Sequence, residues 1–317
     1  MRILGTGSAL PSKQITNDDL AKFLDTGDEW IFPRTGIRSR HIITDEQLED
    51  LAVEAAEKAL RMAGLGPGDI DFIVCSNVVN KYITPGLGSV VAAKMGICCP
   101  NMDINCGCSG FVYGMDLIDK YFRAGAVKNV LMVAAEEPTR MVSWTDRSTC
   151  VLFGDGAGAI VFTEGDNFLA SKLSASPDPE PLHEYHVMEP TPYLTREEYN
   201  LPLQMKGREV FKFAITACLN DIRAVLEKTG KAPGDIDHYI IHQANQRIVD
   251  GIQQRLGERK EKFLSHIIDH GNSSSASCLI LLDEFNRRGT FRNGDLLMFS
   301  GFGAGLLSAA ALLEWEL

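Results

Sequence analysis

One cysteine in this sequence stands where a reactive thiol is expected. Cys108 follows a short strand-like segment and a turn. The apolar positions after it recur at helical spacing: Phe111, Met115, Ile118 and Phe122. Cys108 would therefore open a helix, where the helix dipole and free backbone N–H groups lower the pKa of a thiol. Gly107 and Gly110 permit a tight turn and the close approach of a substrate. The pattern predicts a cysteine nucleophile that forms a covalent intermediate.

Two other interpretations of this cysteine remain open from the residues alone. A buried cysteine often serves as a small hydrophobic side chain, and Cys106, on the predicted strand two residues earlier, is interpreted in that way. A C-x-C pair could also bind a metal ion, but no complementary pair of cysteines or histidines at zinc spacing lies nearby. We therefore expect no metal site here.

An internal repeat indicates how the chain is organised around this cysteine. The segment PGDIDFIVCS at 67–76 recurs as PGDIDHYIIH at 233–242, and each copy follows a helical pattern that stops at a glycine. Two further pairs of segments match in the same order: 108–125 with 272–289, and 129–137 with 294–302. The offset is nearly constant, at about 166 residues. Three ordered matches at one offset favour a duplication.

The repeat predicts two similar α/β halves, one spanning 1–168 with the cysteine and one spanning 169–317. The strands expected in each half are continuous apolar runs, which is typical of sheets that are covered by helices on both faces. The polar, proline-rich stretch 176–202 fits neither copy, so we interpret it as an insertion that could line a substrate pocket.

Composition excludes several classes of function. The chain has 317 residues, 45% of them hydrophobic, which is enough to bury a large core. No secretory signal and no apolar run of the roughly 20 residues needed for a bilayer span is visible, so we expect no membrane role. Eight cysteines sit mostly in apolar runs, as in a reducing compartment, which indicates a cytoplasmic protein. A net charge of −11 argues against a nucleic-acid surface.

Ordered motifs along almost the whole chain resemble one known family. The segment DINCGCSGF at 103–111 resembles the nucleophile motif of the β-ketoacyl-[acyl carrier protein] synthase III family. Further resemblances are GTGSALP at 5–11, DEWIFPRTGIRSRH at 28–41, TDRST at 145–149, FGDGAGA at 153–159, GREVFKFA at 207–214, HQANQRI at 242–248, HGNSSSAS at 270–277 and SGFGAG at 300–305. The resemblance implies a thiolase-like fold, in which two duplicated α/β halves pack as a five-layered αβαβα sandwich.

The resemblance also implies a catalytic triad of Cys108, His242 and Asn272. Without it, His242 at the end of the repeated strand and Asn272 in a turn of small residues would each be interpreted as a hydrogen-bonded core side chain. His270 lies close by, but the family pattern gives the third position to the asparagine. A neutral imidazole and an amide can donate hydrogen bonds to the enolate of a decarboxylating condensation without adding a permanent charge.

An oxyanion hole is implied at the backbone N–H groups of Cys108 and Ala304. The family commonly has three glycines at the second of these turns, whereas this chain has Gly303, Ala304 and Gly305. The alanine keeps the N–H group but requires backbone angles that a side chain tolerates.

Substrate contacts follow from the same resemblance. Trp30 and Arg147 would lie on either side of the coenzyme A adenine, with Arg34 near its phosphates. Arg208 and Asn245 would flank the pantetheine channel. The acidic acyl carrier protein would dock on three cations: Lys212, Arg247 and Arg255. From the residues alone, the tryptophan could equally be a core anchor and the cations ordinary solvated charges.

The function implied is a decarboxylative condensation of an acyl-coenzyme A primer with malonyl-acyl carrier protein, which gives 3-oxoacyl-acyl carrier protein and starts fatty acid synthesis. Such an acyltransferase needs no cofactor, because coenzyme A enters as part of the substrate, and family members form homodimers. Two alternatives remain open: a related acyltransferase or condensing enzyme of secondary metabolism, and a non-catalytic subunit that binds acyl carriers.

Overall fold

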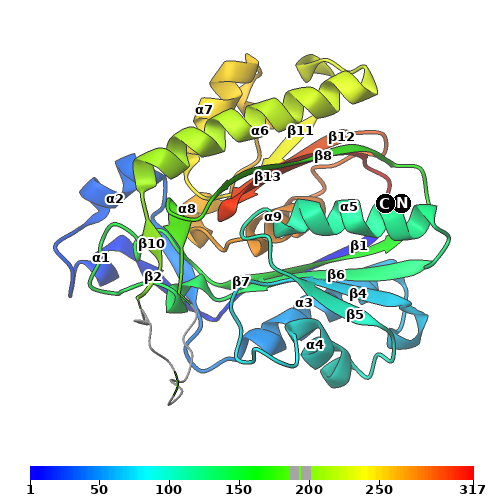
Figure 1. Cartoon of the computed structure of the whole chain (residues 1–317), viewed down its shortest axis with the longest axis horizontal. Coiled ribbons are helices and arrows are strands. Elements are labelled where there is room, and N and C mark those ends of the chain that lie inside the picture. The colour runs from blue at the N-terminus through cyan, green and yellow to red at the C-terminus, as the bar shows by residue number, and fades with distance from the viewer. Residues whose placement is uncertain (186–192, 194–200) are drawn as a thin grey trace.

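The protein stacks five alternating layers of helix and sheet (Figure 1), as the computed structural model shows for the residues it describes, 1–185, 193 and 201–317. Each of two main β-sheets lies between helices, and one pair of helices forms a middle layer shared by both sheets. The N- and C-termini lie side by side at one end of the molecule. The predicted αβαβα sandwich is confirmed.

The first sheet has the strand order β1-β7-β6-β4-β5. Its strands are β1 (Arg2–Ala9), β4 (Phe72–Ser76), β5 (Asn101–Ile104), β6 (Asn129–Glu136) and β7 (Gly156–Thr163). Strand β4 pairs in parallel with β5 and β6, while β7 is antiparallel to β6 and β1. Because helices cover both faces, β4 and β6 are buried almost throughout, which explains their continuous apolar sequences.

The second sheet repeats this pattern with four strands in the order β11-β12-β13-β8. They are β8 (Phe168–Asp178), β11 (His238–Ile241), β12 (Leu296–Gly303) and β13 (Gly305–Glu314). Strand β11 is parallel to β12, and β13 runs antiparallel between β12 and β8. The repeated Pro-Gly-Asp sequence forms the short turns η1 (Pro67–Asp69) and η3 (Pro233–Asp235) before the equivalent strands. The domain boundary at 168/169 remains a proposal. It falls after the first residue of β8, the strand with which the second sheet begins.

The middle layer holds α5 (Gly110–Arg123) and α9 (Ala276–Arg287), whose apolar side chains pack into one core with both sheets. The two helices begin 166 residues apart. This offset makes Cys108 equivalent to Ser274, two residues before each helix. The sequence comparison had paired Cys108 with Asn272, and the structure corrects that alignment by two residues.

Helices also form the two outer layers. The first sheet is covered by α3 (Leu48–Ala63) and α4 (Leu87–Met95), and the second by α6 (Gly207–Thr229) and α7 (Gln246–Leu256). As predicted, the repeated helices α3 and α6 each end at a glycine, and both glycines have left-handed backbone angles, with φ of 68° at Gly64 and 66° at Gly230.

The remaining elements are short. They are β2 (Lys13–Thr16), α1 (Asn17–Leu20), α2 (Asp28–Thr35), β3 (Ser39–Ile42), η2 (Pro138–Arg140), β9 (Leu182–His183), β10 (Gln204–Met205), η4 (Lys260–Lys262) and α8 (Ile267–His270). Much of the predicted insertion at 176–202 lies outside the described residues. In its described part, β9 pairs with β10, a strand that begins two residues after the end of the insertion. No helix in the described part of the chain is long and apolar enough to span a bilayer.

Candidate active site

A cavity of about 240 Å³ is lined by residues from both halves of the chain, including all three predicted catalytic side chains. Cys108 comes from the first half, and His242 and Asn272 come from the second. Most other side chains that line it are apolar: Val151, Leu152, Phe153, Leu182, Met205, Val210, Phe211, Ile248 and Phe302. The cavity therefore offers a few polar groups in an apolar enclosure, as small-molecule sites commonly do.

Cys108 lies between β5 and α5, two residues before the helix begins. Cys108 is partly buried, and its Sγ lies within hydrogen-bond distance of Ser274 Oγ, at 3.3 Å. Burial raises the pKa of the Cys108 thiol to about 12, and the hydrogen bond between the sulfur and Ser274 has a smaller, opposite effect on this pKa. The expected depression of this pKa is therefore wrong, because desolvation outweighs the position at the start of a helix. The thiol needs a proton acceptor when it reacts.

His242 follows β11 directly and is buried, with its backbone N–H donating to Ser300 O over 2.8 Å. Its Nδ1 lies 2.9 Å from Ser277 Oγ, which also accepts a hydrogen bond from the backbone N–H of Gln243. The serine proton is then free to be donated to Nδ1, which favours the tautomer with a proton on Nε2. Burial lowers the pKa of His242 to about 3, so the imidazole is neutral at physiological pH.

Asn272 is fixed in the loop after α8 by hydrogen bonds of its own backbone. Its N–H donates to Leu152 O over 2.8 Å, and its carbonyl accepts from Gly154 N over 3.1 Å. The side-chain Oδ1 accepts from Ser274 N over 2.9 Å, which orients the amide. Because Oδ1 is engaged in this way, the NH₂ group is the end of the side chain left to donate into the cavity.

The two N–H groups of the predicted oxyanion hole belong to backbone turns that touch each other. A Cβ added at Gly303 would lie 2.6 Å from Cys108 N, and one at Gly107 would lie 2.9 Å from Ala304 N. Glycine is therefore required at both positions for the turns to approach so closely. Among the described residues other than glycine, Ser274 alone has a positive φ, so Ala304 adopts angles that alanine tolerates. The prediction for Ala304 is consistent with this geometry.

Replacing Gly303 by alanine is expected to lower the rate of Cys108 acylation by on the order of 100-fold, because the new methyl group forces the two N–H groups apart. Rapid-quench mass spectrometry of the acylated protein measures this rate. Gly68→Ala is the matched control, since a Cβ at Gly68 meets nothing within 4 Å and should leave the rate unchanged. Acylation of Gly303→Ala at the wild-type rate would show that the contact between the turns is unimportant.

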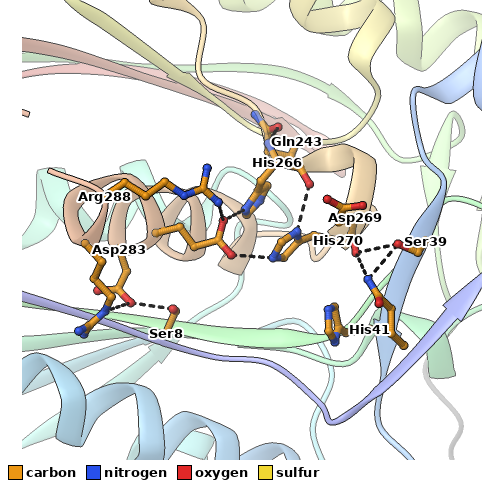
Figure 2. Close-up of polar contacts among 12 residues, drawn as sticks. Ser8, Ser39, His41, Gln243, His266, Asp269, His270, Asp283 and Arg288 are labelled. Carbon is orange, nitrogen blue, oxygen red and sulfur yellow. Dashed lines mark hydrogen bonds and ion pairs between the residues drawn. The ribbon is translucent and has the colours of Figure 1, made fainter. Parts of the chain in front are cut away.

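His266 and His270, which Figure 2 labels, form a cluster with Glu284. His270 is the last residue of α8 and precedes Asn272 by two positions. Glu284 contacts His266 Nδ1 over 3.0 Å and His270 Nε2 over 2.7 Å, and Arg288 Nη2 lies 3.8 Å from the same carboxylate. The two imidazole rings are stacked at 4.2 Å with an angle of 11°. Lone pairs of parallel rings do not converge on one point, and the arginine adds positive charge. The cluster therefore fits a carboxylate that bridges two imidazoles, rather than a metal site.

The predicted coenzyme A contacts Arg34 and Arg147 both lie against Trp30; Trp30 and Arg34 line the cavity, and Arg147 is not one of the residues that line it. The guanidinium carbon of Arg34 lies 4.9 Å from the centre of the Trp30 ring, and that of Arg147 lies 5.0 Å from it. Arg147 also donates to the carbonyl of Asp25 and pairs with its carboxylate over 3.1 Å. The separation of Arg147 from Trp30 leaves no room for a base between them. An adenine can stack there only after Arg147 moves away from the tryptophan.

The other predicted contacts differ in their positions. Asn245 lines the cavity, but its side chain caps α7 by accepting from Arg247 N over 2.9 Å and donates to Arg34 O over 3.1 Å. Arg208 is exposed in the first turn of α6 and is not one of the residues that line the cavity. The predicted docking cations Lys212, Arg247 and Arg255 are all exposed on the packed pair α6 and α7. Their roles remain predictions.

Sequence reasoning missed two polar residues next to the nucleophile, Ser274 and Glu136. The serine could have been found from the repeat, because an offset of 166 residues pairs it with Cys108. No local pattern marks Glu136, which reads as the last residue of an apolar strand.

The layered fold and the cysteine-lined cavity define the class of this protein, an acyltransferase with the thiolase fold. Two family models match the chain: 3-Oxoacyl-[acyl-carrier-protein (ACP)] synthase III over residues 102–177, and the C terminal model of the same enzyme over residues 226–315. Together with the full-length relatives below, these matches show that the chain belongs to the β-ketoacyl-[acyl carrier protein] synthase III family.

Similar proteins match over nearly their whole length. The chain is 42% identical to a β-ketoacyl-[acyl-carrier-protein] synthase III of Xanthomonas euvesicatoria, over 99% of this chain and 98% of the relative. It resembles the crystal structure of 3-oxoacyl-[acyl-carrier-protein] synthase III from Aquifex aeolicus with a TM-score of 0.92 at 38% identity, covering 99% of each chain. It also resembles the priming β-ketosynthase of the R1128 polyketide biosynthetic pathway, with a TM-score of 0.92 at 34% identity, covering 99% of this chain and 96% of the other.

Proposed function

We propose that Cys108, His242 and Asn272 perform the condensation for which the family is named. The protein joins an acyl primer, delivered as its coenzyme A thioester, to malonyl-acyl carrier protein and releases carbon dioxide. The product is 3-oxoacyl-acyl carrier protein, and the reaction starts fatty acid synthesis. The observation that carries the assignment of roles is the cavity in which the thiol of Cys108, the neutral imidazole of His242 and the amide of Asn272 meet.

In the first half-reaction, Cys108 Sγ attacks the thioester carbonyl and coenzyme A leaves with its sulfur. The tetrahedral intermediate places negative charge on the carbonyl oxygen, which accepts hydrogen bonds from the backbone N–H groups of Cys108 and Ala304 in this proposal. The close approach of the two turns that carry these N–H groups supports it. The apolar walls of the cavity hold the acyl chain and exclude water from the new thioester.

In the second half-reaction, malonyl-acyl carrier protein loses carbon dioxide and its enolate attacks the acyl group on Cys108. The Nε2–H of His242 and the amide of Asn272 donate hydrogen bonds to the enolate oxygen. Both donors are neutral, so they stabilise charge as it develops without holding the malonyl carboxylate in place beforehand. The thioester and the release of carbon dioxide drive the reaction, which therefore needs no metal or redox cofactor.

Replacing Trp30 by alanine is expected to raise KM for the acyl-coenzyme A substrate by about 10-fold to 100-fold, because stacking on a base contributes roughly 1–3 kcal/mol. The KM for malonyl-acyl carrier protein should not change. Steady-state kinetics with each substrate varied in turn measures both constants. Phe23→Ala, which removes an exposed aromatic ring outside the cavity, serves as the control. Equal KM values for acyl-coenzyme A in Trp30→Ala and the wild type would show that the adenine does not stack on Trp30.

Arg34, Arg208 and Asn245 complete the proposed coenzyme A contacts, and the acyl carrier protein docks on Lys212, Arg247 and Arg255. These three cations lie exposed on neighbouring helices, an arrangement that favours association with an acidic partner. We further propose that the protein acts as a homodimer in the cytoplasm, and that its two halves divide at 168/169.

A second candidate function is the priming of a polyketide or another secondary product. The similarity to the priming β-ketosynthase of a polyketide pathway favours this candidate. A non-catalytic role in binding acyl carriers remains the alternative from a different class, and retention of the three polar side chains in one cavity weighs against it.

Intact-protein mass spectrometry tests the proposal. The protein is mixed with acetyl-, branched-chain and medium-chain acyl-coenzyme A in turn, and malonyl-acyl carrier protein is then added. We expect a mass gain of one acyl group at Cys108, followed by release of carbon dioxide and formation of 3-oxoacyl-acyl carrier protein. Acylation without consumption of malonyl-acyl carrier protein would favour another acyl transfer, and no acylation by any donor would favour the non-catalytic role.

A further inference from the structure

A buried glutamate lies one hydroxyl group away from the nucleophile. Glu136 ends strand β6 and is only 1% exposed. Ser274 Oγ lies 3.3 Å from Cys108 Sγ and 3.1 Å from Glu136 Oε1. The three groups form a continuous path from the thiol to the carboxylate, with the serine contributed by the second half of the chain.

The surroundings of Glu136 suit a group that changes its charge. Ser275 Oγ donates to Oε1 over 2.6 Å, and Val78 N–H donates to Oε2 over 3.1 Å. The titratable groups that face the carboxylate are the thiols of Cys108 and of Cys75 on β4. No lysine, arginine or histidine forms an ion pair with it in the described part of the chain. Burial raises the pKa of Glu136 to about 7 despite the hydrogen bonds, so both charge states are populated near neutral pH.

Ser274 is held in place between the two groups. Its φ of 51° lies in the left-handed region that residues with a side chain rarely adopt, and its N–H donates to Asn272 Oδ1 over 2.9 Å. A hydroxyl has one proton to donate and two lone pairs that accept. It can therefore accept from the thiol of Cys108 while it donates to the carboxylate of Glu136.

His242 is poorly suited to take the thiol proton. Its hydrogen bond with Ser277 favours the tautomer with a proton on Nε2, and that nitrogen is then a donor. Among the described residues, the hydrogen-bond partner of Cys108 Sγ is Ser274. The path to Glu136 is thus the one that the geometry provides.

We propose that Ser274 relays the thiol proton of Cys108 to Glu136 during acylation, with Glu136 acting through Ser274 as a positioning residue and proton store. This inference rests on the proposed function, because it assumes that Cys108 is acylated by a coenzyme A thioester. It adds a proton acceptor to the three side chains already assigned.

The proton transfers balance over the two half-reactions. As Sγ attacks the thioester carbonyl, the thiol proton passes to Ser274 Oγ and the serine proton passes to Glu136 Oε1. The carbon–sulfur bond to coenzyme A breaks, and its thiolate takes a proton from solvent. In the condensation, the bond from Cys108 Sγ to the acyl carbon breaks and the cysteine leaves as a thiolate. Ser274 then returns a proton to Sγ and regains one from Glu136.

The test is the rate of Cys108 acylation by acyl-coenzyme A alone, measured by rapid quench and intact mass between pH 5.5 and pH 9. Only ionised Glu136 can accept a proton, so the wild-type rate should rise with pH, bend near pH 7 and then stay constant. Glu136→Gln and Ser274→Ala should each lose this bend and react on the order of 100-fold more slowly at the plateau.

Ser275→Ala is the matched control, because Ser275 bonds to the same carboxylate oxygen, whereas the hydrogen bond with Cys108 Sγ belongs to Ser274. The hydrogen bond from Ser275 lowers the pKa of Glu136, so its loss should raise this pKa and move the bend to higher pH. The plateau rate should stay near that of the wild type. Thermal unfolding of each variant establishes that it is folded. If Glu136→Gln fails to fold, the comparison of the two adjacent serine variants decides the question.

Two outcomes would overturn the relay. The first is a wild-type protein that is acylated at a rate independent of pH across this range. The second is a Ser274→Ala variant with the wild-type rate and bend. Either would show that the thiol proton takes another route, and would leave the proposed function intact. Failure of the wild-type protein to accept an acyl group from any coenzyme A thioester would overturn the proposed function, and the relay with it.

Discussion

Replacing Cys108 by alanine is expected to abolish the acyl-enzyme and to lower the condensation rate on the order of 10⁴-fold or more, because Cys108 supplies the one thiol among the described residues that line the cavity. The mass of the protein after mixing with acyl-coenzyme A, and the rate of 3-oxoacyl-acyl carrier protein formation, measure the two effects. The second thiol of the C-x-C segment provides an internal comparison.

Cys106→Ala is the matched control for this variant. Burial raises the pKa of the Cys106 thiol too, and the side chain does not line the cavity. This variant should be acylated at close to the wild-type rate. An acyl group that still attaches to Cys108→Ala, or that is lost in Cys106→Ala, would move the nucleophile away from Cys108.

Replacing His242 by alanine is expected to separate the two half-reactions. Acylation of Cys108 should continue, because the backbone N–H groups and not the imidazole stabilise the first oxyanion. Condensation should fall by about 10²-fold to 10³-fold, since one donor to the enolate is lost. Single-turnover measurements of acylation, and then of product formation from the isolated acyl-enzyme, give the two rates.

Asn272→Ala should likewise keep acylation and lose condensation, so the two variants test each other. The low pKa of His242 adds a pH criterion: the imidazole is already neutral at pH 5, so its titration should not limit the condensation rate anywhere above that pH. Loss of acylation in His242→Ala, with the protein folded, would contradict the division of labour and make the imidazole part of the first step.

Much of the fold was predictable because its signals are local and repeated. The Pro-Gly-Asp turns, the glycines that end α3 and α6 and the apolar strands each appear twice, so two weak signals support each other. The position of Cys108 before a helix was equally visible. The direction of its pKa shift was not, because desolvation depends on how the second half covers the site.

The residues that the sequence did not reveal are those whose role depends on contacts between the halves. Glu136 and Ser274 are 138 residues apart and meet only after both sheets have packed on the middle layer. The contact of Arg147 with Asp25 and Trp30 likewise joins distant loops. Such contacts leave no periodic pattern in the sequence. The helices and strands within each half do leave one, because their apolar residues recur at regular spacing.

The equivalence of Cys108 and Ser274 has a consequence for the ancestry of the site. Each residue stands two positions before its helix in one copy of the repeat, and the two side chains touch. In an ancestor made of two identical chains, the same residue would have met its own copy across a symmetry axis. Fusion of the two copies removed the need for identity, so one position could specialise as a sulfur nucleophile and its twin as a hydroxyl. The contact between Cys108 and Ser274 would thus descend from a contact between two copies of the same residue in a symmetric dimer.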